Sequence, residues 1–176
     1  TSKLGLSVCL ISMDKGAIGR MSCNPAIGGV AKGQLVRELD MLGGVMGALA
    51  DRSGLQYKML NKSKGRSVWS PRSQVDKRIY ERLVSNLVLG LKNFIFIAGE
   101  VVSIKVKNNT VSGVTLRDGT TICASAVVLT CGTFLSGIIH VGDRKIPAGR
   151  MGESPALGVT ESLSSLGFRT MRLKTG

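Results

Sequence analysis

The sequence predicts an α/β protein with an inserted antiparallel β-meander, and three features of the chain predict it. A short apolar run at residues 6–12 is typical of a buried strand, segments with helical apolar spacing follow it, and closely spaced strand-like runs begin at residue 94. Strands and helices in this order favour the kind of sheet that binds nucleotides. The chain has 176 residues, enough for one domain with a buried core.

The first part of the chain is expected to contain a strand, a loop and a helix. The strand covers residues 6–12, and the loop at residues 20–29 contains an Asn-Pro turn and a Gly-Gly pair. The helix is predicted over residues 30–42 and ends at Gly43-Gly44. Its buried stripe is expected to consist of leucines: Leu35, Leu39 and Leu42.

A second, longer helix is predicted to begin at Ser70-Pro71. Serine favours the N-cap position, and proline favours the first helical position. Apolar residues then recur every four positions and define the expected buried face: Val75, Ile79, Leu83 and Leu87. The segment before this helix, residues 55–69, is polar and basic and is expected to be irregular.

The second half of the chain is predicted to be mainly strands. A strand at residues 94–98 leads into a small antiparallel meander, whose runs are separated by Asn-Asn and Asp-Gly turns. The meander covers residues 101–107, 111–117 and 121–124. An apolar strand at residues 126–130 and a helix at about residues 155–166 complete the prediction.

The charge balance is strongly basic. The chain contains 24 Lys and Arg against 11 Asp and Glu, a formal net charge of +13. This balance favours a polyanionic partner, with nucleic acid first and an anionic membrane second, over an ordinary basic surface. Aromatic residues make up 4% of the chain, which argues against a stacking platform for single-stranded bases.

The four cysteines do not form a metal-binding pattern. The sequence has no C-x-x-C pair and a single histidine, His140, which disfavours a zinc site and any histidine-dependent triad. Cys9, Cys123 and Cys131 lie in or beside apolar runs and are expected to be buried, as in a reducing intracellular compartment. No apolar run approaches the 18 residues of a membrane span.

The segment at residues 22–29 (SCNPAIGG) is the strongest candidate for chemistry. Its glycines allow a planar or anionic ligand to approach the backbone, and amides at the start of the following helix favour negative charge. Cys23 has Arg20 and Lys32 nearby in sequence, and such surroundings favour a reactive thiolate. A tight turn around a buried cysteine explains the same pattern equally well.

Residues 20–33 (RMSCNPAIGGVAKG) resemble the signature of the MnmG/GidA family. This family is the large FAD-dependent subunit of the tRNA wobble-uridine modification enzyme. The resemblance continues, in the order of the family, through residues 38–44, 54–65, 70–77, 127–137, 140–142 and 172–176. It implies that residues 1–176 are part of a two-dinucleotide-binding, glutathione-reductase-like FAD domain, with the strand and β-meander at about 94–124 inserted in it.

The resemblance also implies a reaction. The family adds an aminomethyl or carboxymethylaminomethyl group to carbon 5 of the wobble uridine of certain tRNAs. FAD is the implied cofactor, NADH the reductant and methylenetetrahydrofolate the carbon donor, while an MnmE-type GTPase and a second copy of the chain are the implied protein partners. The expected compartment is the bacterial cytoplasm, with the mitochondrial matrix or a plastid as alternatives.

Residue roles follow from the same resemblance. Cys23 matches the cysteine that the family uses in catalysis near the flavin. Cofactor contacts are implied for Asn24, Gly28, Gly29, Val101, Thr130, Gly132, Thr133 and Ala156. Ala156 stands where the family often has serine, so a hydroxyl contact is missing there.

The basic segment before the second predicted helix is expected to bind tRNA phosphates, an attraction that depends on salt and hardly on sequence. The residues assigned to this role are Lys62, Lys64, Arg66 and Arg72. A solvated loop and helix face, with Arg72 on the helix, is the simpler alternative, and a flavin contact is the other role considered for Lys64 and Arg72. No metal ligand is expected.

Several features of the family are absent from the sequence. The GxGxxG-type turn for the FAD pyrophosphate is expected upstream of Thr1, and a second functional cysteine, most of the NADH-binding insert and a C-terminal helical domain are also missing. The segment alone is therefore expected to bind FAD weakly or not at all and to be inactive. Two other interpretations remain open: a fragment of a generic flavin oxidoreductase, and a non-catalytic basic RNA-binding module.

Overall fold

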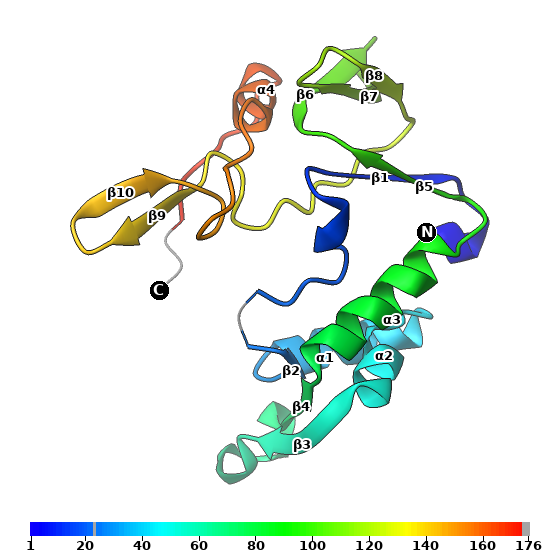
Figure 1. Ribbon diagram of the computed structural model, residues 1–176, viewed down its shortest axis with the longest axis vertical. Coiled ribbons are helices and arrows are strands. Elements are labelled where there is room, and N and C mark those ends of the chain that lie inside the picture. The colour runs from blue at the N-terminus through cyan, green and yellow to red at the C-terminus, as the bar shows by residue number, and fades with distance from the viewer. Residues whose placement is uncertain (23, 174–176) are drawn as a thin grey trace. The chain divides into compact units, whose positions relative to one another are not determined.

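The computed structural model describes residues 1–22 and 24–173, which form helices and short sheets in two compact units (Figure 1). Unit 1 contains residues 1–10 and 14–97, and unit 2 contains residues 11–13 and 98–176. Within the described ranges, no helix is both long enough and apolar enough to cross a membrane.

Unit 1 is built around an antiparallel sheet of three strands in the order β2-β4-β3. These strands are β2 (Ala26–Gly28), β4 (Ser70–Val75) and β3 (Gly54–Leu60). Ser73 in the central strand lies opposite Ile27 on one side and Tyr57 on the other. A loop with two short 3-10 turns, Lys62–Lys64 and Arg66–Val68, joins β3 to β4.

Three helices belong to this unit: α1 (Lys32–Met41), α2 (Met46–Arg52) and α3 (Lys77–Leu89). Helices α1 and α2 both contact β2 and β4 (Figure 1). Four buried residues from α2, β4 and α3 form the core: Leu49, Ala50, Val75 and Tyr80. Strand β1 (Val8–Ser12) pairs with β5 (Phe94–Ala98) in a separate two-stranded sheet.

The helix predicted to begin at Ser70-Pro71 begins instead at Lys77. Asp76 is its N-cap, because its carboxylate accepts a hydrogen bond of 2.9 Å from the Ile79 N–H. Residues 70–75, together with the first part of the segment expected to be irregular, form strands β4 and β3. Pro71 has no N–H to donate to a neighbouring strand. It is nevertheless compatible with the central strand, because β2 ends at Gly28, opposite Arg72, and no β2 residue pairs with Pro71.

The helix predicted at residues 30–42 is present as α1, but its predicted buried stripe is wrong. Leu35 and Leu42 are 58% and 83% exposed, because Gly33 and Val36 face the sheet instead. Leu39, the third leucine of the predicted stripe, is also exposed. Helix α2 was not predicted, since the Gly-Gly pair before it resembles the end of a helical region.

Unit 2 contains the predicted meander, with β6 (Val101–Lys107), β7 (Thr110–Leu116) and β8 (Thr121–Cys123) paired in that order. Its first turn has Asn108 and Asn109 at φ +51° and +57°, the left-handed values typical of a two-residue hairpin loop. Helix α4 (Val159–Ser165) packs on β6, and a hairpin of β9 (Ile138–Val141) and β10 (Arg144–Pro147) completes the unit (Figure 1).

Two further sequence predictions fail in the structure, and one element was missed. Residues 126–130 are not a strand, because no described strand pairs with them, and Val128 is 83% exposed. The hairpin β9–β10 was not predicted. Cys9 and Cys123 are exposed and Cys131 is half-buried, because β1 and β8 lie in small sheets that cover little of their side chains.

A close backbone contact joins α1 and β2 to the central strand. The Gly29 N–H donates a hydrogen bond of 2.9 Å to the Pro71 carbonyl oxygen. A Cβ atom at Gly28 would lie 2.2 Å from the same oxygen, and one at Gly33 would lie 3.0 Å from it. Gly28 also has a φ of +93°, which favours glycine. Only glycine fits at Gly28 without a shift of the backbone.

We therefore expect Gly28→Ala to destabilise the protein strongly. Gly65→Ala is the matched control, because Gly65 has a φ of +95° and a Cβ there would meet no atom within 4 Å. Both variants carry the cost of positive φ, but only Gly28→Ala adds the clash, so its loss in free energy of unfolding should exceed that of Gly65→Ala by about 1–3 kcal/mol. Urea denaturation measures both values, and equal losses would contradict the contact.

Candidate functional site

The loop that leads into β2 carries the first group of predicted site residues. Asn24 is exposed, and its carbonyl accepts a hydrogen bond of 2.7 Å from the Ala26 N–H. Gly28 and Gly29 follow, and both approach Pro71 rather than open space. Cys23, the predicted catalytic residue, lies outside the described residues. The close backbone approach that the sequence assigned to a ligand is therefore made, at Gly28, by the chain itself.

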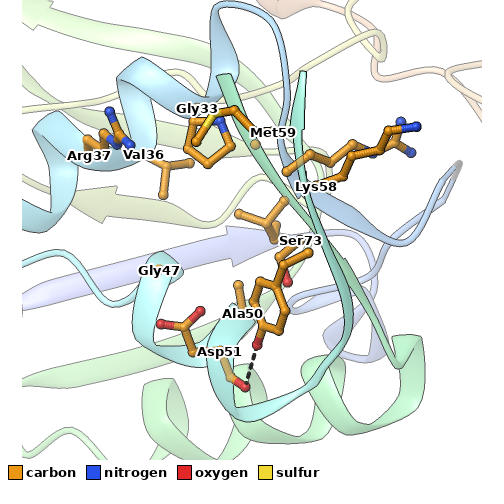
Figure 2. A pocket seen from close by; sticks show the side chains of 14 residues that line it. Gly33, Val36, Arg37, Gly47, Ala50, Asp51, Lys58, Met59 and Ser73 are labelled. Atoms are coloured by element: carbon orange, nitrogen blue, oxygen red, sulfur yellow. Dashed lines mark hydrogen bonds between the residues drawn. The ribbon is translucent and has the colours of Figure 1, made fainter. Parts of the chain in front are cut away.

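A hollow of about 290 Å³ lies between α1, α2 and the sheet (Figure 2). Its walls include Gly33, Val36, Ala50 and Met59. Tyr57 and Asp51 also line it, and the Tyr57 hydroxyl donates a hydrogen bond of 3.1 Å to the Asp51 carbonyl. The surface of the hollow is mainly apolar, but four charged residues also contribute to its walls: Arg37, Asp51, Lys58 and Arg72.

The loop between β3 and β4 carries three of the four predicted RNA-binding residues. The Trp69 indole N–H donates a hydrogen bond of 3.2 Å to the Lys62 carbonyl, and the Arg66 guanidinium lies 5.8 Å from the centre of the indole ring. These contacts hold the loop in shape and leave the side chains of Lys62, Lys64 and Arg66 exposed. The structure thus presents an ordered basic loop.

Arg72, the fourth of these residues, lies on the central strand and not on the loop. It is half-buried and stands opposite Lys58 of β3 and Gly28 of β2. The structure therefore brings Arg72 beside one of the predicted cofactor glycines. Lys62, Lys64 and Arg66 stay together at the tip of the β3–β4 hairpin.

Unit 2 carries the second group of predicted cofactor residues. The Thr133 hydroxyl donates a hydrogen bond of 2.7 Å to the Gly149 carbonyl. The Ala156 N–H donates to the Phe134 carbonyl, and the Ser136 N–H donates to the Ala156 carbonyl, each over 2.9 Å. Ala156 is thereby held against the segment that follows Thr133. Thr130 and Gly132 are exposed, and Gly132 has a φ of +56°.

Glu100, which the sequence analysis missed, connects Val101 with the segment around Ala156. Its carboxylate accepts hydrogen bonds from Arg117 Nε at 2.5 Å, Arg117 Nη2 at 2.6 Å and the Leu157 N–H at 2.9 Å. The Arg117 guanidinium, and then the Leu157 N–H, hold the pKa of this carboxyl below its usual range. An acidic residue in the short turn between two predicted strands was the available signal.

Comparison with known proteins identifies the family. The whole chain, residues 1–176, matches the protein family described as glucose inhibited division protein A. The chain belongs to this family. Proteins named tRNA uridine 5-carboxymethylaminomethyl modification enzyme MnmG are similar to it throughout: the one from Chlorobium phaeobacteroides is 47% identical over 99% of the chain, and the one from Chlorobaculum tepidum is 49% identical over 98%.

Solved structures agree with the family and with the fold. The structure of Aquifex aeolicus GidA covers 96% of the chain with a TM-score of 0.88 and 44% identity. The GidA-related protein from Thermus thermophilus has a TM-score of 0.60 at 18% identity, which shows the fold alone. The predicted α/β fold class is confirmed. The chain spans about 28% of the length of these MnmG relatives and of Aquifex GidA.

The lowered pKa of Glu100 predicts a stability change on the acid side. The ionised carboxylate stabilises the folded chain, so its contribution is complete above the unfolded pKa of about 4.3. It is lost as the pH falls through the lower pKa of the folded state. We expect Glu100→Gln to remove this part of the acid dependence of stability.

Thermal or urea unfolding between about pH 2 and pH 7 tests this. Glu38→Gln is the control, because Glu38 is exposed on α1 and forms no ion pair with another described residue. If the two variants have the same pH profile as the unchanged protein, Glu100 does not contribute as described.

Proposed function

We propose that this chain forms part of the flavin-binding region of an enzyme that modifies the wobble uridine of tRNA at carbon 5. The observation that supports this most strongly is the similarity along nearly the whole chain to proteins named tRNA uridine 5-carboxymethylaminomethyl modification enzymes. The net charge of +13 suits a tRNA substrate. Aminomethyl or carboxymethylaminomethyl is the proposed group.

FAD is the proposed cofactor, and in unit 2 the backbone of the proposed contact Gly132 is accessible to it. A Cβ atom at Gly132 would meet nothing within 4 Å, so this exposed glycine leaves room for a cofactor beside the backbone. Thr130, Thr133, Val101 and Ala156 are the other proposed contacts in unit 2. Bound FAD would supply hydride chemistry, while these residues would hold and orient it.

In unit 1, Asn24, Gly28 and Gly29 are the proposed contacts to the flavin ring. The Gly29 N–H already donates to the Pro71 carbonyl, and the Gly29 carbonyl already accepts from the Gly33 N–H, so the exposed Asn24 is the group that remains for a ligand. Cys23 is the proposed catalytic residue, as nucleophile or as acid and base toward uracil. Lys62, Lys64, Arg66 and Arg72 are proposed to bind tRNA phosphates.

The remaining components of the reaction are proposed from the family alone. NADH is the reductant, methylenetetrahydrofolate is the carbon donor, and an MnmE-type GTPase and a second copy of the complete protein are the partners. The proposed compartment is the bacterial cytoplasm.

A segment exchange tests the proposed function. The chain replaces its matching segment in the Chlorobium phaeobacteroides relative, and the chimera is expressed in a bacterium that lacks its own MnmG. We expect mass spectrometry of tRNA nucleosides to detect the modified wobble uridine. An inactive but folded chimera that binds FAD would contradict the proposal.

The role of Cys23 is tested in the same chimera. Cys23→Ala should lower the rate of modification by about 100-fold or more, the lower end of what a positioned catalytic group contributes. Cys9→Ala and Cys123→Ala are matched controls at exposed cysteines and should leave the rate unchanged. Full activity of Cys23→Ala would show that Cys23 is not the catalytic residue.

The proposed cofactor contact at Gly132 predicts a specific effect on FAD affinity. Gly132→Ala should weaken FAD binding by about tenfold or more, because the added methyl group occupies space assigned to the cofactor. Gly142→Ala is the matched control: Gly132 and Gly142 have φ values of +56° and +57°, and a Cβ at either would meet no atom within 4 Å. Flavin fluorescence titration of the complete protein measures both, and equal affinities would remove Gly132 from the site.

A further inference from the structure

One face of the β2-β4-β3 sheet carries four polar side chains in two register pairs. Gln56 lies opposite Gln74, and Lys58 lies opposite Arg72. Alternate residues of a strand share a face, so these four side chains, which we call the polar quartet, lie together. Ser73 and the core residue Val75 occupy the other face, toward the helices. Figure 2 shows the Lys58 side chain leaving β3 on the side away from Ala50 and Ser73.

The polar quartet has no partners within the part of the chain that the structure describes. None of its side chains forms a hydrogen bond or an ion pair with another residue of 1–22 or 24–173. Lys58 and Arg72 are like charges placed directly opposite each other, an arrangement that destabilises a sheet. An anion bound between them would remove this repulsion, so the two side chains suit a phosphate group.

The neighbouring strand leaves room for an extended ligand. Ala26 lies opposite Gln74, and Gly28 lies opposite Arg72. On this face β2 therefore has at most one side-chain carbon at each position. A chain of nucleotides can lie along β2 with its phosphates toward Lys58 and Arg72, and with a base edge toward the amides of Gln56 and Gln74.

We propose that the polar quartet binds an unpaired stretch of tRNA, and that its glutamines contact the edge of a base. Glutamine amides both donate and accept hydrogen bonds, as the edge of uracil does, and unpaired bases are the part of RNA that proteins read by sequence. The inference rests on the proposed function. An open, one-sided face suits a polynucleotide better than a dinucleotide, whose pyrophosphate is usually held at a glycine-rich helix start.

Salt dependence separates the two roles within the quartet. A phosphate contact on single-stranded nucleic acid adds about 0.7 to the slope of log affinity against log salt. For Lys58→Ala/Arg72→Ala in the complete protein, the fall in tRNA affinity between 50 and 200 mM salt should therefore be about sevenfold smaller than in the unchanged protein. Gln56→Ala/Gln74→Ala should keep the slope but weaken binding by about fivefold or more.

The matched control is Lys77→Ala/Arg78→Ala, which removes the same two charge types from exposed positions on α3. This control should leave the salt slope of tRNA binding unchanged and should alter the tRNA affinity by less than about twofold. FAD affinity of every variant is measured in parallel, because a pyrophosphate carries the same chemistry as an RNA phosphate. Loss of FAD affinity with an unchanged tRNA slope would assign the pair to the cofactor and overturn the proposal.

Two outcomes separate this inference from the proposed function. If the complete protein modifies tRNA while the quartet variants bind it like the unchanged protein, the surface is wrong and the function stands. If the protein binds tRNA through the quartet but modifies no uridine, the surface stands and the function is wrong.

Discussion

The contact of Gly28, Gly29 and Gly33 with the Pro71 carbonyl constrains the rest of unit 1. One oxygen accepts the hydrogen bond from Gly29 and lies where side chains at Gly28 and Gly33 would be. The contact fixes β2 beside β4 and the start of α1 against the same strand. As a result, the loop that carries Asn24 and the strand that carries Arg72 are held in one register, although nearly 50 residues separate them in sequence.

The two faces of this small sheet differ in polarity and charge. The helix-facing side is apolar and closed by the core around Val75, whereas the opposite side has two cations in direct register. Such a pair is unfavourable in a free sheet and favourable beside an anion. The loop at the tip of the hairpin also presents cations at the surface. There the Trp69 contacts hold Arg66 and the loop that carries Lys62 and Lys64 in place.

Sequence patterns predicted the elements whose signals are local. The Asn108-Asn109 turn specified the meander, and the glycine segment before α1 was recognised from its residues. The failures have physical causes that lie outside the local pattern. Ser70-Pro71 resembles a helix start, but Asp76 caps the helix and tertiary pairing makes a strand. Leu35 and Leu42 follow helical periodicity, yet the sheet packs on the glycine side of α1. The pairing of Lys58 with Arg72 depends on the register of two strands, which cannot be predicted from a short segment of the sequence.

The proposed contact between this chain and the wobble uridine is tested most directly by a crosslink. A tRNA with 4-thiouridine at the wobble position is bound to the complete protein with FAD, irradiated and digested, and the crosslinked peptide is sequenced by mass spectrometry. The account predicts a peptide from the segment around Asn24 or from strands β3 and β4. Efficient crosslinking that occurs entirely outside residues 1–176 would contradict it.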